Sequence, residues 1–306
     1  MPPGFALASS AFEATGLATE IDRRLAGLDS GDLEAVRSTS AAVGELVRHA
    51  SVPARIRAEV EDRYDALPGA SPPVAVRSSA VGEDSAEATF AGQQETYLWV
   101  RGADRVCDAV RDCWASLYSP EAISYRARIG DAGRAPAMGV AVQLMVDAEV
   151  SGVMFTCNPV TGDPSSVAVN ASWGLGLAVV GGEVTPDEYR VSKVTGEVLQ
   201  RTLGPKQVEY LPDPAGGGTI RADVPVERQG VACLEHAQLA ALLDVGRRVE
   251  RHFGGHQDVE WAIDRDGELH LLQSRPVTTA SAKAAPPGPR SAMDLVLGTF
   301  GVRKGT

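Results

Sequence analysis

Lysine is scarce in this sequence. Only four of the 29 basic residues are lysines, Lys193, Lys206, Lys283 and Lys304, so arginine supplies nearly all the positive charge. Acidic residues number 40, and the formal net charge is -11. A nucleic-acid-binding surface needs a basic footprint, so this balance argues against nucleic acid as a partner. It does not exclude a nucleotide ligand, because a few arginines in a cleft set the local field.

Cysteines are also few, and long apolar runs are absent. The four cysteines form no CxxC pair, which favours buried thiols in a reducing compartment over disulfides or a metal site. The first residues, MPPGFALASS, show no basic segment followed by an apolar run, and they predict no signal peptide. Because no stretch of about 18 apolar residues occurs, we expect no membrane span and a cytoplasmic location.

The remaining composition is that of an ordinary globular chain. Of its 306 residues, 44% are hydrophobic and 23% are charged. A chain of this length buries a sizeable core without disulfide or metal support. We therefore expect one large domain or two lobes.

The order of the predicted elements indicates an α+β fold. Helical spacing covers residues 10–67, 104–118 and 238–253. Strand patterns cover residues 74–77, 96–100, 139–145, 150–156, 167–171 and 189–193, with a weak hairpin within 204–230. Strands grouped between helices in this way predict mixed or antiparallel sheets and not a doubly wound βαβ series.

The last two strands give the sharpest chemical inference. Strands over 259–263 and 268–273 flank Asp266-Gly267, a strong hairpin signal. A two-residue turn there places position 260 opposite 273, and 258 opposite 275. Because side chains alternate in a strand, one face of the hairpin carries Asp258, Glu260, Gln273 and Arg275. The opposite face carries the apolar residues Val259, Trp261, Ile263 and Leu272.

Two carboxylates, an amide oxygen and a guanidinium on one face suit a metal–phosphate site. Mg²⁺ takes hard oxygen ligands, commonly one or two carboxylates together with phosphate oxygens. Arginine pairs bidentately with phosphate. The alternative from this segment alone is a cross-strand Asp258–Arg275 salt bridge on a solvated face.

Three other segments carry weaker signals. Arg77 ends a strand and opens the polar stretch 78–94, whose backbone N–H groups could cradle phosphates, or which could be a plain surface loop. The apolar strand ending at 143–146 could receive a flat purine or could be ordinary core. Glycines within 173–190 could let a helix N-terminus approach an anion, or could serve tight packing.

Taken in order, several long motifs resemble one family. They are PPGF, VAVRSSAVGEDSAEATFAGQQETYLWV, WASLYSPEAISYRAR, QLMVDAEVSGVMFTCNP, NASWGLGLAVVGGEVTPDEYRV and DVEWAIDRDGELHLLQSRP. Together they resemble the N-terminal ATP-binding domain of pyruvate phosphate dikinase and phosphoenolpyruvate synthase, which rifampin phosphotransferase shares. The resemblance covers nearly all of residues 2–278.

The resemblance implies an ATP-grasp-like nucleotide-binding domain of two lobes. The first lobe would cover residues 1–185, with the helical start, the Arg77 phosphate loop and the adenine-side strands. The second would cover 186–278 with the metal-binding hairpin. Residues 279–306 would form a linker and a flexible tail, in which 293–300 could dock a partner.

The resemblance also implies roles for individual residues. Arg77 and Arg275 would act on the ATP phosphates, and Asp258 would support the metal ligands. Mg²⁺ would be held by Glu260 and Gln273. The segment over the phosphates would include Thr89, Gly92 and Gln93, and the adenine pocket would include Gln143, Met145 and Val146.

Three departures from the family pattern bear on activity. The glycine-rich GGKG-like loop of the family is not found, and no lysine precedes Lys193. The family's GLGE reads GLGL, with Leu177 in place of glutamate. None of the five histidines stands in the small-residue context of a family phosphohistidine.

Three functional hypotheses follow. In the first, the chain takes a phosphoryl group from Mg·ATP, leaving AMP and phosphate, and passes it to a histidine on a separate partner protein. In the second, it is a stand-alone ATP-grasp-type kinase or ligase that acts on a small-molecule acceptor of unknown identity. In the third, it is a degenerate nucleotide-binding module without catalytic activity.

Overall fold

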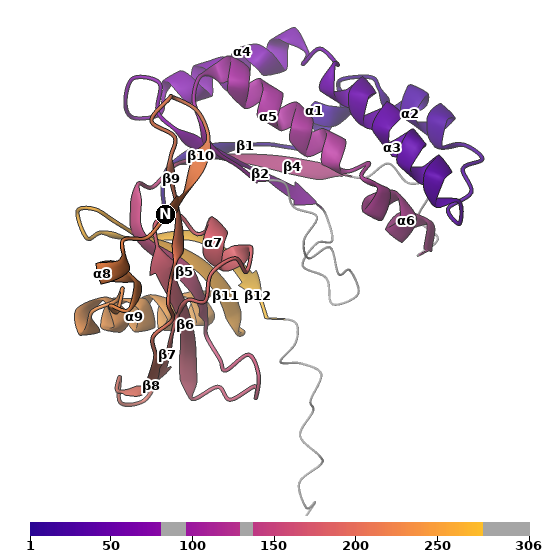
Figure 1. Cartoon of the computed structure of the whole chain (residues 1–306). Helices are drawn as coiled ribbons and strands as arrows, with labels where there is room; N and C mark the ends of the chain where they lie inside the picture. The colour runs from indigo at the N-terminus through magenta and orange to yellow at the C-terminus, as the bar shows by residue number, and fades with distance from the viewer. Residues whose placement is uncertain (81–95, 129–136, 278–306) are drawn as a thin grey trace, which may run out of the picture.

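The chain folds into two lobes that face each other (Figure 1). The computed structural model describes residues 1–80, 96–128 and 137–277. Within these residues, every strand pair is antiparallel, and groups of helices alternate with groups of strands along the chain. The predicted α+β class with antiparallel sheets is therefore confirmed.

The first lobe is a four-stranded sheet covered by helices. Its strand order is β1 (Gly4–Leu7), β4 (Met138–Leu144), β2 (Val74–Ala80) and β3 (Thr96–Val100). The helices are α1 (Ser10–Glu13), α2 (Ala18–Leu25), α3 (Leu33–Arg48), α4 (Ala54–Asp65), α5 (Ala103–Ser116) and α6 (Pro120–Arg128). Helix α5 carries the predicted apolar face, and its Val106, Val110 and Trp114 are buried in the core of this lobe.

The second lobe is a six-stranded sheet packed against one long helix. Its strand order is β12 (Leu269–Pro276), β11 (Gln257–Asp264), β5 (Ala148–Phe155), β6 (Ser166–Trp173), β7 (Asp187–Ser192) and β8 (Val198–Thr202). Helix α9 (His236–Phe253) buries Leu239, Leu242 and Val249 in the core of this sheet, and it ends at Gly254 in the left-handed conformation. Short helices α7 (Leu177–Val180) and α8 (Val226–Gln229) and the hairpin β9 (Val208–Pro212) and β10 (Thr219–Asp223) complete it.

The two sheets do not follow the predicted lobe boundary between residues 185 and 186. Strands β5 and β6, which that boundary assigns to the first lobe, are hydrogen-bonded into the six-stranded sheet. The chain crosses between the sheets at residues 145–147, between β4 and β5. Sequence periodicity identified these strands but carried no information on which sheet they join. We therefore place the division between the lobes near residue 146.

At Asp258 and Glu260 the β11–β12 hairpin has the predicted pairing, but its turn and the pairing next to the turn differ from the prediction. Asp258 pairs with Arg275 and Glu260 with Gln273, but the register shifts after Glu260, so that Trp261 pairs with Leu271. The turn is longer than the predicted two residues: the Asp264 N–H donates to the Glu268 carbonyl oxygen at 3.1 Å. Gly267, at φ +83°, gives the left-handed residue that such a turn requires.

The longer turn shifts the pairing of the two strands by one residue, and the bulge shifts it back. Leu272 is the extra residue of this bulge, because Gln273 pairs with Glu260 and Leu271 with Trp261. The prediction that Leu272 lies on the buried face with Trp261 is wrong. It packs instead with the apolar cluster at the joint between the lobes. Leu271 takes the place against the core of the second lobe.

A fully buried ion pair ties together three segments of the second lobe. Lys206 Nζ donates to Asp187 Oδ1, and both side chains are 0% exposed. Asp187 also accepts from the backbone N–H groups of Gly204, at 3.0 Å, and Cys233, at 2.9 Å. The second oxygen further accepts from the hydroxyl of Tyr189 at 3.2 Å. The contacts with Lys206, Gly204 and Cys233 thus join β7 to the loops around residues 204 and 233, while the Tyr189 contact lies within β7.

A separate apolar cluster fills the joint between the lobes. Trp99 comes from β3, whereas Val146, Leu175 and Ala262 come from the crossing segment and the second lobe. Leu98 and Trp99 together oppose Ala75, a bulge in which Trp99 takes φ +59°. A left-handed conformation is unusual for a bulky residue, and the bulge lets both side chains turn toward the second lobe.

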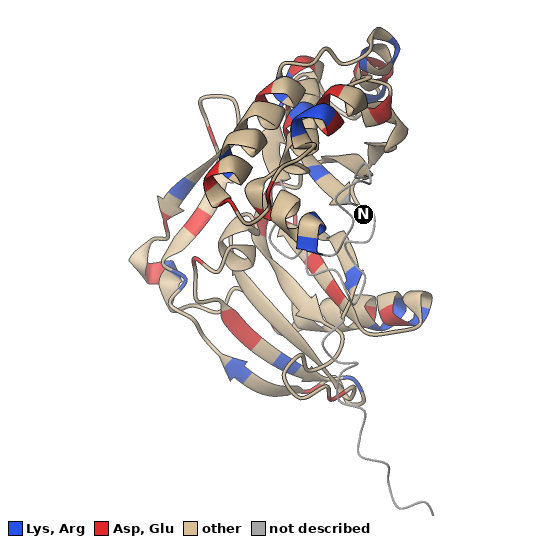
Figure 2. Ribbon diagram, turned by 90° about the vertical axis from the view of Figure 1, so that its right-hand side faces the viewer, with Lys and Arg blue, Asp and Glu red and all other residues tan. Residues whose placement is uncertain are grey.

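The charged residues are interspersed over the fold. Figure 2 shows arginine and lysine alternating with aspartate and glutamate along the helices of both lobes. All four cysteines are buried, as predicted. In the described part of the chain, no helix has the length and apolarity needed to cross a membrane.

Candidate functional site

A pocket lies at the joint between the lobes and is lined by both of them. Strands β2, β3 and β4 supply one wall, and β5, α7, β11 and β12 supply the other. Most of the lining is apolar, while Arg77 and Glu260 are its charged residues among the described ones. An apolar cleft with a few converging polar groups is the usual form of a small-molecule site.

Arg77 links the two walls directly. Its Nη1 donates to Glu260 Oε2 at 2.8 Å and to Gln273 Oε1 at 2.9 Å. The side chains of Arg77 and Glu260 are 20% and 19% exposed. Sequence reasoning placed Glu260 and Gln273 on one face, and the structure brings both to one guanidinium nitrogen from the opposite lobe.

Asp258 lies two residues before Glu260 on the same face of β11, and one of its carboxylate oxygens lacks a hydrogen-bond partner among the described residues. This oxygen, Oδ1, is buried. Burial raises the pKa of Asp258 to about 6, and the negative charge of Glu260 adds to the rise, while Arg275 opposes it. A buried carboxylate beside a second one favours binding of a cation.

These side chains fit a divalent cation. Glu260 and Gln273 offer two oxygens that already converge on one positive nitrogen. The unpartnered Asp258 Oδ1 supplies further negative charge on the same face. Carboxylate and amide oxygens of this kind are what Mg²⁺ binds in proteins. Arg275 stands opposite Asp258 in the register, at the open end of the hairpin.

The apolar part of the pocket includes the three residues predicted for a purine. Gln143, Met145 and Val146 all line it. Gln143 ends β4 with Leu144, while Met145 and Val146 belong to the segment that crosses to the second lobe. Their roles toward a ligand remain predictions. Leu177, the residue found in place of the family glutamate, also lines the pocket and begins α7.

Other pocket residues were not among the predicted ones. Ser151 and Gly152 on β5 line the pocket, and Ser151 Oγ donates to the carbonyl oxygen of Gly174 at 2.6 Å. Leu98 enters through the β3 bulge, which no sequence pattern signals. The glycine-rich stretch after Trp173 did mark one of these segments, because Gly176 also lines the pocket.

Three predicted residues cannot be placed. Thr89, Gly92 and Gln93 lie within residues 81–95, outside the described part of the chain. Their proposed position over phosphates remains a prediction. The predicted linker and tail after residue 277 also lie outside the described residues.

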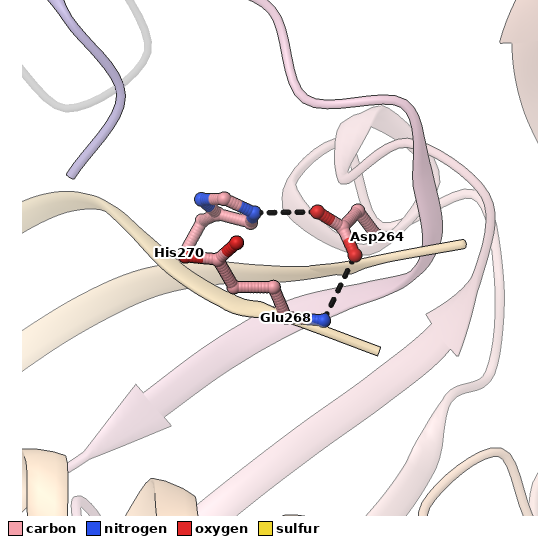
Figure 3. Close-up of side chains that lie close together, drawn as sticks. All are labelled: Asp264, Glu268 and His270. Carbon is pink, nitrogen blue, oxygen red and sulfur yellow. Dashed lines mark hydrogen bonds and ion pairs between the residues drawn. The ribbon is translucent and has the colours of Figure 1, made fainter. Parts of the chain in front are cut away.

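The turn of the β11–β12 hairpin holds a second polar group, distant along the strands from Glu260. Asp264, Glu268 and His270 bring one carboxylate or imidazole atom each to within 4.8 Å of one another (Figure 3). His270 Nε2 lies 2.7 Å from Asp264 Oδ2, and Asp264 Oδ1 accepts from the N–H groups of Asp266 and Glu268. Both oxygens of Asp264 are thus engaged in closing the turn.

Comparison with known families identifies the family to which this chain belongs. The family model described as "Pyruvate phosphate dikinase, AMP/ATP-binding domain" matches residues 1–294. This chain belongs to that family. The match covers both lobes and every described residue of the pocket, so the resemblance stated from the sequence motifs is confirmed.

Curated relatives carry the names of phosphotransferases of this family. A probable phosphoenolpyruvate synthase of Methanothermobacter thermautotrophicus is 42% identical over 287 residues, covering 91% of this chain and 41% of that protein. The phosphoenolpyruvate synthase of Pyrococcus furiosus is 42% identical over 269 residues, covering 84% and 33%. The rifampicin phosphotransferase of a Streptomyces species is 43% identical over 284 residues, covering 91% and 32%. The chain thus spans between about a third and two fifths of these relatives.

One solved structure shows a much weaker likeness. D-alanyl-alanine synthetase A of Vibrio cholerae superposes with a TM-score of 0.30 at 11% identity, covering 87% of this chain and 64% of that one. A likeness this low carries no argument. The ATP-grasp-like fold therefore stays a prediction from the sequence resemblance.

Proposed function

We propose that this domain binds Mg·ATP in the interlobe pocket and transfers a phosphoryl group from it to a histidine of a separate protein, with AMP and phosphate as products. The observation that carries the proposal is the convergence of Arg77, Glu260 and Gln273 from two lobes at one edge of an apolar pocket. Membership of an AMP/ATP-binding family supports the nucleotide.

The apolar and the charged residues of the pocket would bind different parts of Mg·ATP. The apolar side, with Met145 and Val146, would hold the purine ring. Glu260 and Gln273 would hold Mg²⁺, with Asp258 as the neighbouring charge, and the ion would neutralise the phosphate oxygens during transfer. Arg77 and Arg275 would position the phosphates, because a guanidinium pairs bidentately with phosphate oxygens.

The acceptor would come from outside the pocket. All five histidines belong to the described part of the chain, and none of them lines the pocket. His270 and His256 are engaged with the carboxylates of Asp264 and Glu250. An acceptor histidine on a separate protein fits this arrangement.

Product analysis tests the proposal. The purified chain is incubated with Mg·ATP, alone and with the part of the Methanothermobacter relative that this chain does not match, supplied as a separate protein. We expect AMP to form much faster when the second protein is present. Glu260→Gln is expected to abolish this AMP, whereas Glu268→Gln, an exposed glutamate on the same hairpin, serves as the matched control.

Other products would point to the other hypotheses. ADP formed with a small acceptor would replace the dikinase reaction by that of a stand-alone kinase or ligase. If Mg·ATP neither releases heat in calorimetry nor raises Tm, the proposed nucleotide site is wrong, since a ligand bound only by the folded state stabilises it.

A further inference from the structure

Arg77 occupies the position at which the proposed cation would bind. Its Nη1 lies 2.8 Å from Glu260 Oε2 and 2.9 Å from Gln273 Oε1. The two oxygens proposed as Mg²⁺ ligands are therefore already bound to a positive group. That group comes from β2 in the first lobe, whereas both oxygens belong to the second lobe.

A guanidinium and a divalent cation compete for these oxygens. An oxygen that coordinates a metal at close range cannot keep a short charge-assisted hydrogen bond along the same direction, and the two positive charges repel each other. Binding of the cation thus requires Arg77 to move away from Glu260 and Gln273.

Breaking the hydrogen bonds of Arg77 to Glu260 and Gln273 without forming new ones would be energetically unfavourable. The side chain of Arg77 is four-fifths buried, and its Nε is already buried without a hydrogen-bond partner among the described residues. A buried guanidinium that loses its carboxylate has an uncompensated charge. Phosphate oxygens are suitable replacements, because they carry negative charge and accept two parallel N–H bonds.

We propose that Arg77 makes metal binding conditional on nucleotide: its guanidinium holds the Glu260–Gln273 position until a polyphosphate gives it new partners. The free divalent cation is then excluded, and metal and nucleotide bind with strong mutual cooperativity. This inference rests on the proposed function, which assigns the pocket to a metal–nucleotide complex. By linkage, the metal strengthens nucleotide binding by the same factor by which nucleotide strengthens metal binding.

Mn²⁺ binding measured by electron paramagnetic resonance and calorimetry tests the inference without any turnover. The titrations are made with and without α,β-methylene-ATP, whose α–β bridge resists cleavage, on the natural chain and on Arg77→Met. We expect the natural chain to bind free Mn²⁺ at least about tenfold more weakly than Arg77→Met, a ratio that corresponds to ~1.4 kcal/mol. The same variant is expected to bind the nucleotide analogue more weakly than the natural chain.

Opposite shifts in the two affinities separate this role from a merely structural one, which would weaken both. Arg265→Met is the matched control: Arg265 lies in the turn of the same hairpin, and the change removes the same charge from an exposed pair with Asp147 of the crossing segment. We expect it to leave free Mn²⁺ binding unchanged within about twofold.

Each result bears on a different proposal. If the analogue binds but free Mn²⁺ binds equally to the natural chain and to Arg77→Met, the inference is wrong and the nucleotide site stands. If the analogue does not bind to the natural chain, the proposed function fails and this inference with it. Should Arg77→Met not fold, the natural chain alone decides: Mn²⁺ that binds as tightly without nucleotide as with it overturns the inference.

Discussion

Replacing Lys206 by methionine should strongly destabilise the second lobe. The ammonium group of Lys206 is the only cationic partner of Asp187 among the described residues, and neither side chain touches solvent. Methionine fills a similar volume but leaves the carboxylate charged and buried. Removing one partner of a buried ion pair costs about 3–5 kcal/mol, because the remaining charge has no compensation.

That loss is large for a protein of this kind. Domains are commonly stable by only about 5–15 kcal/mol. For chains of roughly 150–250 residues, each kcal/mol lowers Tm by about 2–4 °C, so Lys206→Met should lower Tm by on the order of 10 °C. Urea unfolding followed by tryptophan fluorescence measures the change, since Trp173 and Trp261 belong to the core of the same sheet.

A double variant separates the charge from the packing. Asp187→Leu combined with Lys206→Met removes both charges and should be more stable than Lys206→Met alone, because apolar replacement of a buried pair is often close to neutral. Lys193→Met, which breaks a partly exposed pair with Glu250, is the control and should cost about 1 kcal/mol. A loss below ~1 kcal/mol for Lys206→Met would refute the assigned role of this pair.

Two further predictions concern the sheet and the hairpin turn. Gly152→Ala should destabilise by about 3 kcal/mol in urea unfolding, because the new Cβ would overlap the carbonyl oxygen of Asn170 on the neighbouring strand; an unchanged midpoint would contradict this packing. Burial alone would raise the pKa of Asp264, but hydrogen bonds from His270 and from two backbone N–H groups lower it overall. This carboxylate therefore stabilises the fold above pH ~4, and the benefit is lost as pH falls below that value. Asp264→Asn should thus cost about 1 kcal/mol at pH 7 and less near pH 3, with Asp266→Asn in the exposed turn as the matched control.

Local patterns predicted most elements and the face that Glu260 and Gln273 share on the β11–β12 hairpin. Strand alternation and the Asp266-Gly267 turn signal predicted the pairing of Glu260 with Gln273, although the actual turn is one residue longer and a bulge restores the register. They could not reveal the bulge, which involves no special residue type. The bulge moved Leu272 into the pocket while leaving the site register unchanged.

Long-range arrangement was beyond the reach of periodicity. A strand pattern over 150–156 does not state which sheet the strand joins, and β5 joined the second lobe. The contact between Arg77 and Glu260 spans 183 positions in sequence and depends on how the lobes meet. The family resemblance predicted that both residues contact Mg·ATP. Only the structure revealed that their side chains contact each other directly.

The β9–β10 hairpin bridges the two lobes through one backbone hydrogen bond to each. In the middle of β9 the carbonyl oxygen of Tyr210 accepts from the Leu175 N–H at 2.9 Å, and in the turn the Gly218 N–H donates to the Trp99 carbonyl oxygen at 3.3 Å. Figure 1 shows this hairpin rising from the lower sheet to the upper one along one side of the joint. If one lobe rotates so that Arg77 separates from Glu260 while both of these hydrogen bonds remain, the axis of rotation must lie near the hairpin. The entrance to the pocket would then widen on the side opposite the hairpin.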